Sequence, residues 1–131
     1  MILGLYQADA AGESISLEKI ENTIATLQDT PDLGTIELVL DTGNVIGYAI
    51  LINYWSNEYG GFIKFIDEIF IEKAYRSKGI GTQFLHFLMH KKYQSAVAFA
   101  LEVMPNNDRA LRLYQQLGFV LDGRHHLFYQ R

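Results

Sequence analysis

The sequence has 131 residues and contains no cysteine. This absence excludes disulfides, thiolate catalysis and cysteine-ligated zinc. No stretch approaches the roughly 20 uncharged apolar residues of a membrane span. No basic residue precedes the short apolar start, which argues against a secretory signal. We therefore expect a cytoplasmic protein with no membrane partner.

Positive charge is also scarce, because 11 lysines and arginines face 15 acidic residues and give a formal net charge of -4. A net negative chain does not attract a polyphosphate backbone, so we expect no nucleic-acid partner. A local basic patch can still hold a small anion. The length and the 49% of hydrophobic residues indicate one soluble globular domain over residues 1–131.

The spacing of apolar residues predicts an alternation of helices and strands. Leu17, Ile20, Ile24 and Leu27 recur at helical spacing after Ser16, which can cap the helix. Alternating and apolar runs bounded by turn residues predict strands. The predicted elements are a helix at 16–27, strands at 35–40, 45–54 and 62–71, a helix at 79–93, a strand at 96–104, a helix at 108–117 and a strand at 119–128.

This order predicts an α/β fold with a mixed, mostly antiparallel sheet flanked by helices. The strands at 35–40 and 45–54 form an antiparallel hairpin. The strand–helix–strand unit at 62–104 predicts a parallel crossover. The run 96–104 is almost wholly apolar, which is typical of a central strand covered on both faces.

The segment Arg76-Ser77-Lys78-Gly79-Ile80-Gly81-Thr82 lies between a predicted strand and a predicted helix. Its glycines let the backbone approach a ligand closely. A helix start offers unpaired N–H groups and partial positive charge, which together bind phosphate. The alternative is an ordinary turn with two solvated cations.

The segment matches neither of the two common nucleotide-binding motifs. A Walker loop would place Lys-Ser or Lys-Thr after the second glycine, and a dinucleotide fingerprint would place glycine where Phe84 stands. Arg-x-x-Gly-x-Gly after a strand instead resembles the acetyl-CoA signature of the GNAT superfamily of N-acetyltransferases. The resemblance covers roughly residues 35–128 and also includes Asp67-Glu68-Ile69-Phe70-Ile71, Leu101-Glu102-Val103, Asn107-x-x-Ala110-x-x-Leu113-Tyr114 and Leu117-Gly118-Phe119.

The resemblance implies a single GNAT domain in which two parallel strands splay apart to form an acetyl-CoA cleft. It implies that the CoA pyrophosphate rests on the backbone amides of Lys78, Gly79, Ile80, Gly81 and Thr82, with help from Arg76 and Ser77. The pantetheine arm would pair with the backbone of Ile69, Phe70 and Ile71 and approach Asn107 and Tyr114. The sequence departs from the family at its front, where Met1 to Tyr6 leaves room for only a short or missing first strand.

Acetyl transfer to an amine needs a base for the ammonium and an acid for the leaving thiolate. The resemblance favours Tyr114 as the acid, since a phenol is protonated at neutral pH; the alternative is a packed core aromatic. The candidate bases, in order, are Glu102, Glu68 and Asp67, acting directly or through water. Each could instead be a structural hydrogen-bond acceptor.

Four further features carry additional hypotheses. Asp67 and Glu68 are adjacent, so at most one of them should face the cleft. Asp67 also resembles an acidic position of polyamine-type members. His86 and His90 have zinc-like spacing but no third ligand, so we expect no metal. Trp55 and the turn at 58–61 line an acceptor pocket or form an ordinary packed turn, and the pair at 125–126 is expected on the surface.

The sequence thus predicts an N-acetyltransferase that moves an acetyl group from acetyl-CoA to the primary amine of a small molecule or a peptide. The alternative is a non-catalytic acyl-CoA-binding sensor or interaction module, which would keep the loop and dispense with the acid and base. A homodimer is possible, since members of the family often dimerise.

Overall fold

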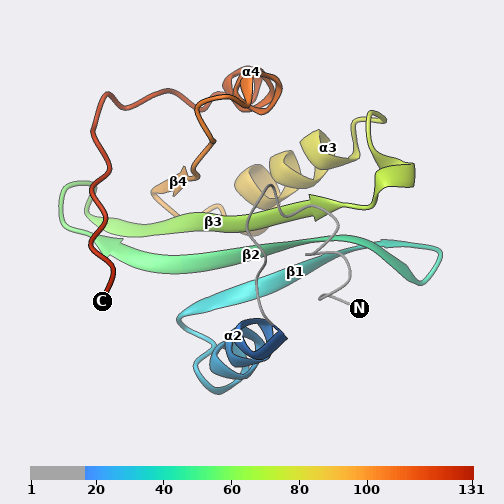
Figure 1. The fold of residues 1–131 in the computed structure, drawn as a ribbon, viewed down its shortest axis with the longest axis horizontal. Coiled ribbons are helices and arrows are strands. Elements are labelled where there is room, and N and C mark those ends of the chain that lie inside the picture. The colour runs from blue at the N-terminus through green and yellow to red at the C-terminus, as the bar shows by residue number, and fades with distance from the viewer. Residues whose placement is uncertain (1–16) are drawn as a thin grey trace.

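The structure is a computed structural model that describes residues 17–131 (Figure 1). Ser16 and the strand expected at Met1 to Tyr6 lie outside the described residues. The regular elements are α2 (Leu17–Asp29), β1 (Gly34–Asp41), β2 (Asn44–Ser56), β3 (Gly61–Ile71), a 3-10 turn (Lys73–Tyr75), α3 (Ile80–Phe87), a π turn (Leu88–Lys92), β4 (Ala98–Ala100) and α4 (Asp108–Gln116).

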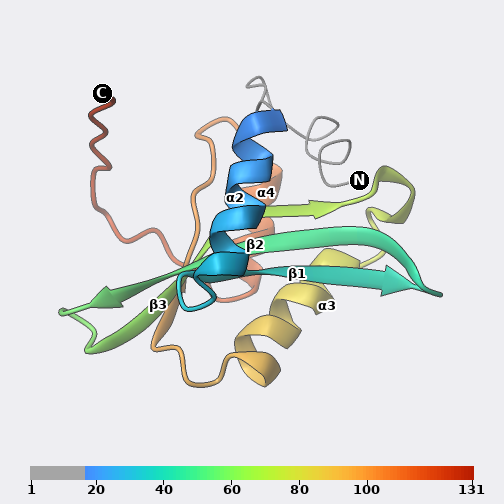
Figure 2. The same ribbon diagram turned by 90° about the horizontal axis from the view of Figure 1, so that it is seen from below.

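The strands form one sheet in the order β1-β2-β3-β4. The pairs β1–β2 and β2–β3 are antiparallel, and β3–β4 is parallel. Helix α2 covers one face, and α3 and α4 lie on the other (Figures 1 and 2). The predicted α/β fold with a mixed, mostly antiparallel sheet is therefore confirmed.

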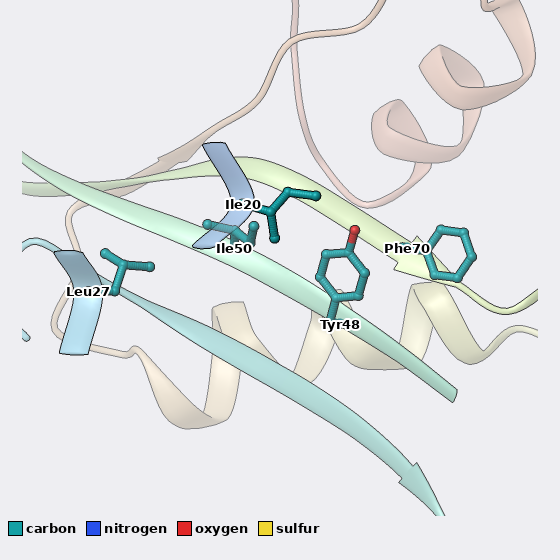
Figure 3. Close-up of a cluster of buried hydrophobic side chains, with 5 residues drawn as sticks. All are labelled: Ile20, Leu27, Tyr48, Ile50 and Phe70. Atoms are coloured by element: carbon teal, nitrogen blue, oxygen red, sulfur yellow. The ribbon is translucent and has the colours of Figure 1, made fainter. Parts of the chain in front are cut away.

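A hydrophobic cluster joins α2 to its face of the sheet (Figure 3). Ile20 and Leu27 of α2 pack over Tyr48 and Ile50 of β2 and Phe70 of β3. The rings of Tyr48 and Phe70 stack with centroids 5.8 Å apart. Tyr48 and Ile50 lie two residues apart on β2 and therefore share a face.

A second cluster fills the space between the sheet and α3. Its buried members are Ala49 and Leu51 of β2, Ile66 of β3, and Leu85 and Leu88 of α3 and the π turn. Helix α4 adds partly buried side chains to the same cluster. The opposite parity of the β2 residues in the two clusters shows that β2 lies between two packed layers.

The ladder between β2 and β3 is interrupted by a bulge at Asp67. Ile50 pairs with Glu68 and Leu51 pairs with Ile66, so Asp67 has no counterpart on β2. A bulge inserts one residue and bends its strand. Beyond it the alternation of β3 is inverted, and Ile69 packs in the same cluster as Ile66 although the two residues are three apart.

Two predicted strands were wrong in extent or in kind. The strand expected over 96–104 is only Ala98–Ala100, and it forms an edge of the described sheet and not its centre. Residues 101–104 leave the sheet toward α4. The segment 119–128 forms no strand, because none of its residues pairs with a strand of the described sheet. A strand requires a partner ladder as well as an apolar sequence.

The helix expected over 79–93 is present, but its winding changes from α-helical to π-helical near its end. It is α-helical to Phe87 and then forms the π turn, in which the amide of Tyr93 donates to the carbonyl of Leu88 at 3.0 Å. Over residues 17–131, no helix is long and apolar enough to cross a bilayer.

Candidate functional site

Strands β3 and β4 pair over a short length and then separate. Their ladder consists of Ile63 with Ala98, Lys64 with Phe99 and Phe65 with Ala100. After Ala100 the chain diverges from β3 toward α4 (Figure 1). The edge of β3 from 66 to 71 therefore has no strand beside it within the described residues. An extended ligand can add to such an edge as an extra strand.

Residues 76–82, which we call the anion loop, follow the open end of β3. Ser77 adopts φ 62° and Gly79 φ 79°, both in the left-handed region. Gly79 is the N-cap of α3. Because glycine has no side chain, it offers no capping oxygen to the free amides of the first helical turn. These amides remain available to an anion, and the helix dipole favours negative charge there.

The two glycines of the loop are required for different reasons. Gly79 meets the conformational requirement of a positive φ. Gly81 lies inside α3 with an ordinary helical φ, and a Cβ placed on it would touch only Cγ1 of Ile71, at 3.8 Å. Neither conformation nor internal packing demands glycine at position 81. The open space in front of its backbone is what a closely approaching phosphate needs.

Basic side chains surround the loop. The Nε of Arg76 donates to the carbonyl of Ile71 at 2.7 Å, and its guanidinium lies 5.2 Å from the ring centroid of Phe70. The Nζ of Lys78 lies 5.7 Å from the ring centroid of Tyr75. Arg76 is thus held against the last residues of β3, at the point where the strand passes into the loop.

Arg109, which the sequence analysis did not select, reaches the loop from α4. Its Nη2 donates to Oγ of Ser77 at 3.0 Å. Beyond their short ladder, β3 and β4 diverge, and we call the region between the two diverging segments the opening. The contact joins its two sides, since Ser77 follows β3 and Arg109 follows β4. No motif marks Arg109 in the sequence, because the contact depends on how α4 is placed against the loop.

Helix α4 carries Asn107 and Tyr114, the two residues expected near the pantetheine arm. The Oδ1 of Asn107 accepts from the amide of Ala110 at 3.1 Å and caps the helix. Tyr114 is partly buried and packs in the α3-side cluster, with its ring centroid 6.0 Å from that of Phe119. Both residues therefore have structural contacts in addition to the roles predicted for them.

Two of the three candidate bases lie near each other at the start of the opening. Asp67 is the bulge residue, and Glu102 is the second residue beyond β4. The loss of surrounding water and, to a smaller degree, the like charge of Glu102 raise the pKa of Asp67 above its ordinary value. Asp67 as a whole residue remains exposed. Glu102 has a side chain 65% exposed, and its Oε1 lies 3.9 Å from Nε2 of His126.

Glu68, the third candidate, has a different position. It lies opposite Ile50 on β2, on the face that α2 covers, and is partly buried. The sequence placed Asp67 and Glu68 on opposite faces of a regular strand. The bulge replaces regular alternation there, so the orientation of Asp67 follows from the bulge and not from parity.

Comparison with known proteins identifies the family of the chain. A model of the acetyltransferase (GNAT) family matches residues 5–119. The chain belongs to the acetyltransferase (GNAT) family. A probable spermine N(1)-acetyltransferase of Bacillus subtilis subsp. natto is 29% identical to this GNAT chain over 82% of the chain and 74% of the relative.

Solved structures share the fold of this GNAT chain. A possible acetyltransferase from Clostridium difficile 630 superposes with a TM-score of 0.84 at 18% identity, over 99% of this chain and 88% of that protein. An aminoglycoside N-acetyltransferase in complex with CoA superposes with a TM-score of 0.75 at 18% identity, over 99% and 86% of the two chains. At these identities the likeness concerns the fold alone.

The remaining candidates lie away from the opening. Trp55 is 61% exposed and meets Phe62 edge to face, with centroids 5.2 Å apart, at the end where β3 and β4 are still paired. The rings of His86 and His90 lie 4.5 Å apart. Over residues 17–131, no three acidic or histidine side chains are grouped to hold a metal ion. A hollow of about 320 Å³ lies between β1 and α3, and Ile80 at the start of α3 is among the residues that line it.

Proposed function

We propose that this GNAT chain transfers an acetyl group from acetyl-CoA to a primary amine of a small cationic molecule of the polyamine class. The observation that carries the proposal is the continuous path from the anion loop, along the unpaired edge of β3, to the carboxyl group of Asp67. A phosphate-bearing donor with an extended arm fits this path. A carboxylate at its inner end suits a positively charged acceptor.

For the donor, we propose that the backbone amides of the loop hold the CoA pyrophosphate. The space before Gly81 and the positive end of α3 support this assignment. Arg76 and Ser77 would add hydrogen bonds, with Arg109 reaching the same region through Ser77. The pantetheine arm would lie along Ile69, Phe70 and Ile71, whose backbone faces the opening.

For the acceptor, the charge around the opening supports a cation. Asp67 and Glu102 interact electrostatically, and two like charges near each other attract a polycation more strongly than one. The Bacillus relative is named for spermine, which is such a cation. We therefore propose polyamines ahead of peptide amines as the acceptor class.

For the chemistry, we propose Asp67 as the base and Tyr114 as the acid. The ammonium of the acceptor gives a proton to Asp67, directly or through water, and its nitrogen then attacks the thioester carbonyl carbon. The C–N bond forms, the C–S bond breaks, and the leaving sulfur takes the hydroxyl proton of Tyr114. The acylated nitrogen then gives up its second proton, which restores the phenol of Tyr114, and the proton on Asp67 is released to solvent. A raised pKa makes the Asp67 carboxylate a better proton acceptor than an ordinary aspartate. Glu102, the first choice from sequence, then serves to attract the cation.

Calorimetric titration with acetyl-CoA and CoA, followed by thiol release with a panel of amines, tests the proposal. The panel should contain spermine, spermidine, an aminoglycoside and a short peptide. We expect CoA binding and thiol release that is fastest with the polyamines. Binding without release from any amine would replace the transferase with an acyl-CoA-binding module. No binding would overturn the donor site itself.

A further inference from the structure

The anion loop is held from a second part of the chain, the first turn of α4. Helices α3 and α4 lie on the same face of the sheet, so the start of one can contact the start of the other (Figure 1). There Nη2 of Arg109 donates a hydrogen bond to Oγ of Ser77 at 3.0 Å. Both residues are exposed, so this contact is not a consequence of core packing.

Ser77 has a backbone conformation that needs support. Its φ of 62° lies in the left-handed region, which among the residues other than glycine in the described chain is shared only by Thr42. A residue with a Cβ adopts this region at a cost in free energy, and it stays there only where surrounding contacts hold it. The hydrogen bond from Arg109 is a contact of this kind.

The conformation of Ser77 bears directly on anion binding. Over Ser77, Lys78 and Gly79, φ alternates in sign and is positive at the first and the last of the three. Backbone of alternating hand turns successive N–H groups toward one side and forms an anion-binding concavity. A loop that already has this shape need not be ordered when its ligand binds, and it therefore binds more tightly.

Helix α4 is a firm support for the contact. The Oδ1 of Asn107 accepts from the amide of Ala110 and caps the first turn, beside Arg109. Farther along the helix, Tyr114 and Leu117 pack in the α3-side cluster. The helix is thus fixed by contacts that do not involve the loop, and it can hold the loop in place.

We propose that Arg109 is a positioning residue of the donor site, which keeps the anion loop in its anion-binding conformation through the bond to Ser77. This inference rests on the proposed function, which places the CoA pyrophosphate on the loop. Arg109 acts on the loop and not on the reacting atoms. It therefore raises the affinity for a phosphate-bearing donor and leaves the chemical step unchanged.

Calorimetric titration of Arg109→Ala with CoA is the first test. We expect the Kd to rise roughly three- to tenfold, which is the effect of losing one exposed hydrogen bond. The KM for acetyl-CoA should rise as well, with kcat unchanged at saturating donor. S-acetylpantetheine, which lacks the phosphates, should react equally fast with the variant and with wild type.

Arg112→Ala is the matched control. Arg112 is exposed and lies three residues farther along α4, so this variant loses the same charge from the same helix. It should bind CoA as wild type does. The thermal midpoint checks folding, and because Ser77 and Arg109 are both exposed, no variant at these positions should lower it much.

A double-mutant cycle separates an effect through Ser77 from a direct attraction between Arg109 and phosphate. In the Ser77→Ala background, Arg109→Ala should cause no further loss of CoA affinity, because the hydroxyl that the guanidinium held is already gone. Ser77→Gly should restore part of the affinity lost in Arg109→Ala, because glycine adopts a positive φ without the cost.

An unchanged Kd in Arg109→Ala overturns the proposal and leaves the donor site intact. An equal loss in Arg112→Ala, an undiminished effect of Arg109→Ala in the Ser77→Ala background, or no recovery with Ser77→Gly overturns it too. If wild type itself binds no CoA, the proposed donor site is wrong and this inference fails with it.

Discussion

The two ends of β3 differ in what surrounds the strand. At its beginning, β3 is paired on both sides, with β2 and with β4, and Gly61 packs directly against Val97. At its end, beyond the bulge, its only partner among residues 17–131 is β2, and the strand leads into the anion loop. The paired end holds the sheet together, and the unpaired end has backbone groups to offer a ligand. The proposed donor site thus lies where the pairing of β3 is incomplete.

The largest loss of CoA affinity should come from placing a side chain in front of the loop that follows the open end of β3. In Gly81→Val, the new Cβ would meet Cγ1 of Ile71 at 3.8 Å, which is an ordinary contact, and we expect the fold to remain intact. It should occupy the space in front of the helix amides and abolish CoA binding. Calorimetric titration measures this, with the thermal midpoint as the control for folding. Undiminished affinity would remove the loop from the donor site.

Removing the proposed base should have the next largest effect. Asp67→Asn should lower kcat/KM with a polyamine by roughly 100-fold or more, which is typical for loss of general base catalysis. Asp67 must be deprotonated to act, so wild-type kcat/KM should fall as the pH drops through its raised pKa. Glu102→Gln removes a neighbouring negative charge and should move that fall to lower pH. A pH profile unaffected by Glu102→Gln would contradict the coupling.

Tyr114→Phe should have an intermediate effect on turnover. The loss of the hydroxyl should lower kcat by roughly 100-fold or less, because a thiolate is a good leaving group even without an acid. Phenylalanine keeps the packing against Phe119, so CoA affinity and stability should change little. Stopped assays of thiol release at saturating acetyl-CoA measure kcat. Full activity in the variant would mean that Tyr114 only packs in the core and does not act as the acid.

The matching substitution at the paired end of β3 should lower stability and leave CoA affinity unchanged. In Gly61→Val, the Cβ would lie 2.4 Å from Cγ1 of Val97, so that side chain must move. Overpacking of this kind costs about 1–3 kcal/mol. Denaturant unfolding measures the loss, and CoA affinity of the folded protein should match wild type. Equal loss of affinity in Gly61→Val and Gly81→Val would erase the distinction between the two ends.

The smallest effect concerns polar contacts between β1 and the residues that follow α3. Glu37 accepts hydrogen bonds from Lys92 and Tyr93. Burial alone would raise the pKa of Glu37, but these bonds and the charge of Lys92 outweigh it and hold the pKa below its usual value. Glu37→Gln should therefore lower the free energy of unfolding at neutral pH, by at most about 1 kcal/mol.

The pH dependence of this loss follows from its cause. A group whose pKa is lower in the folded state stabilises the fold above its unfolded pKa, about 4.3 for Glu. The stabilisation is lost as the pH falls through the folded pKa. Unfolding curves of wild type and Glu37→Gln should therefore converge in acid. A difference that stays constant with pH would mean that the carboxylate charge contributes nothing.

The helices and the antiparallel strands were predictable because periodicity records which side chains are buried. The anion loop was predictable because its glycines and basic residues are adjacent in sequence. The bulge at Asp67 was not, since a single inserted residue disturbs only the pairing with another strand. The early end of β4 and the absence of a strand over 119–128 were also missed, because an apolar run indicates burial or pairing but not which partner provides it. Arg109 depends on the placement of α4 and has no local signal.

The bulge also bears on how the family can diversify. Asp67 is exposed and stands outside the ladder with β2, so neither pairing nor the core dictates its identity. A different side chain there would alter the inner end of the opening and leave the register of every other residue unchanged. The proposed reaction, and not the fold, is therefore what constrains the residue at position 67.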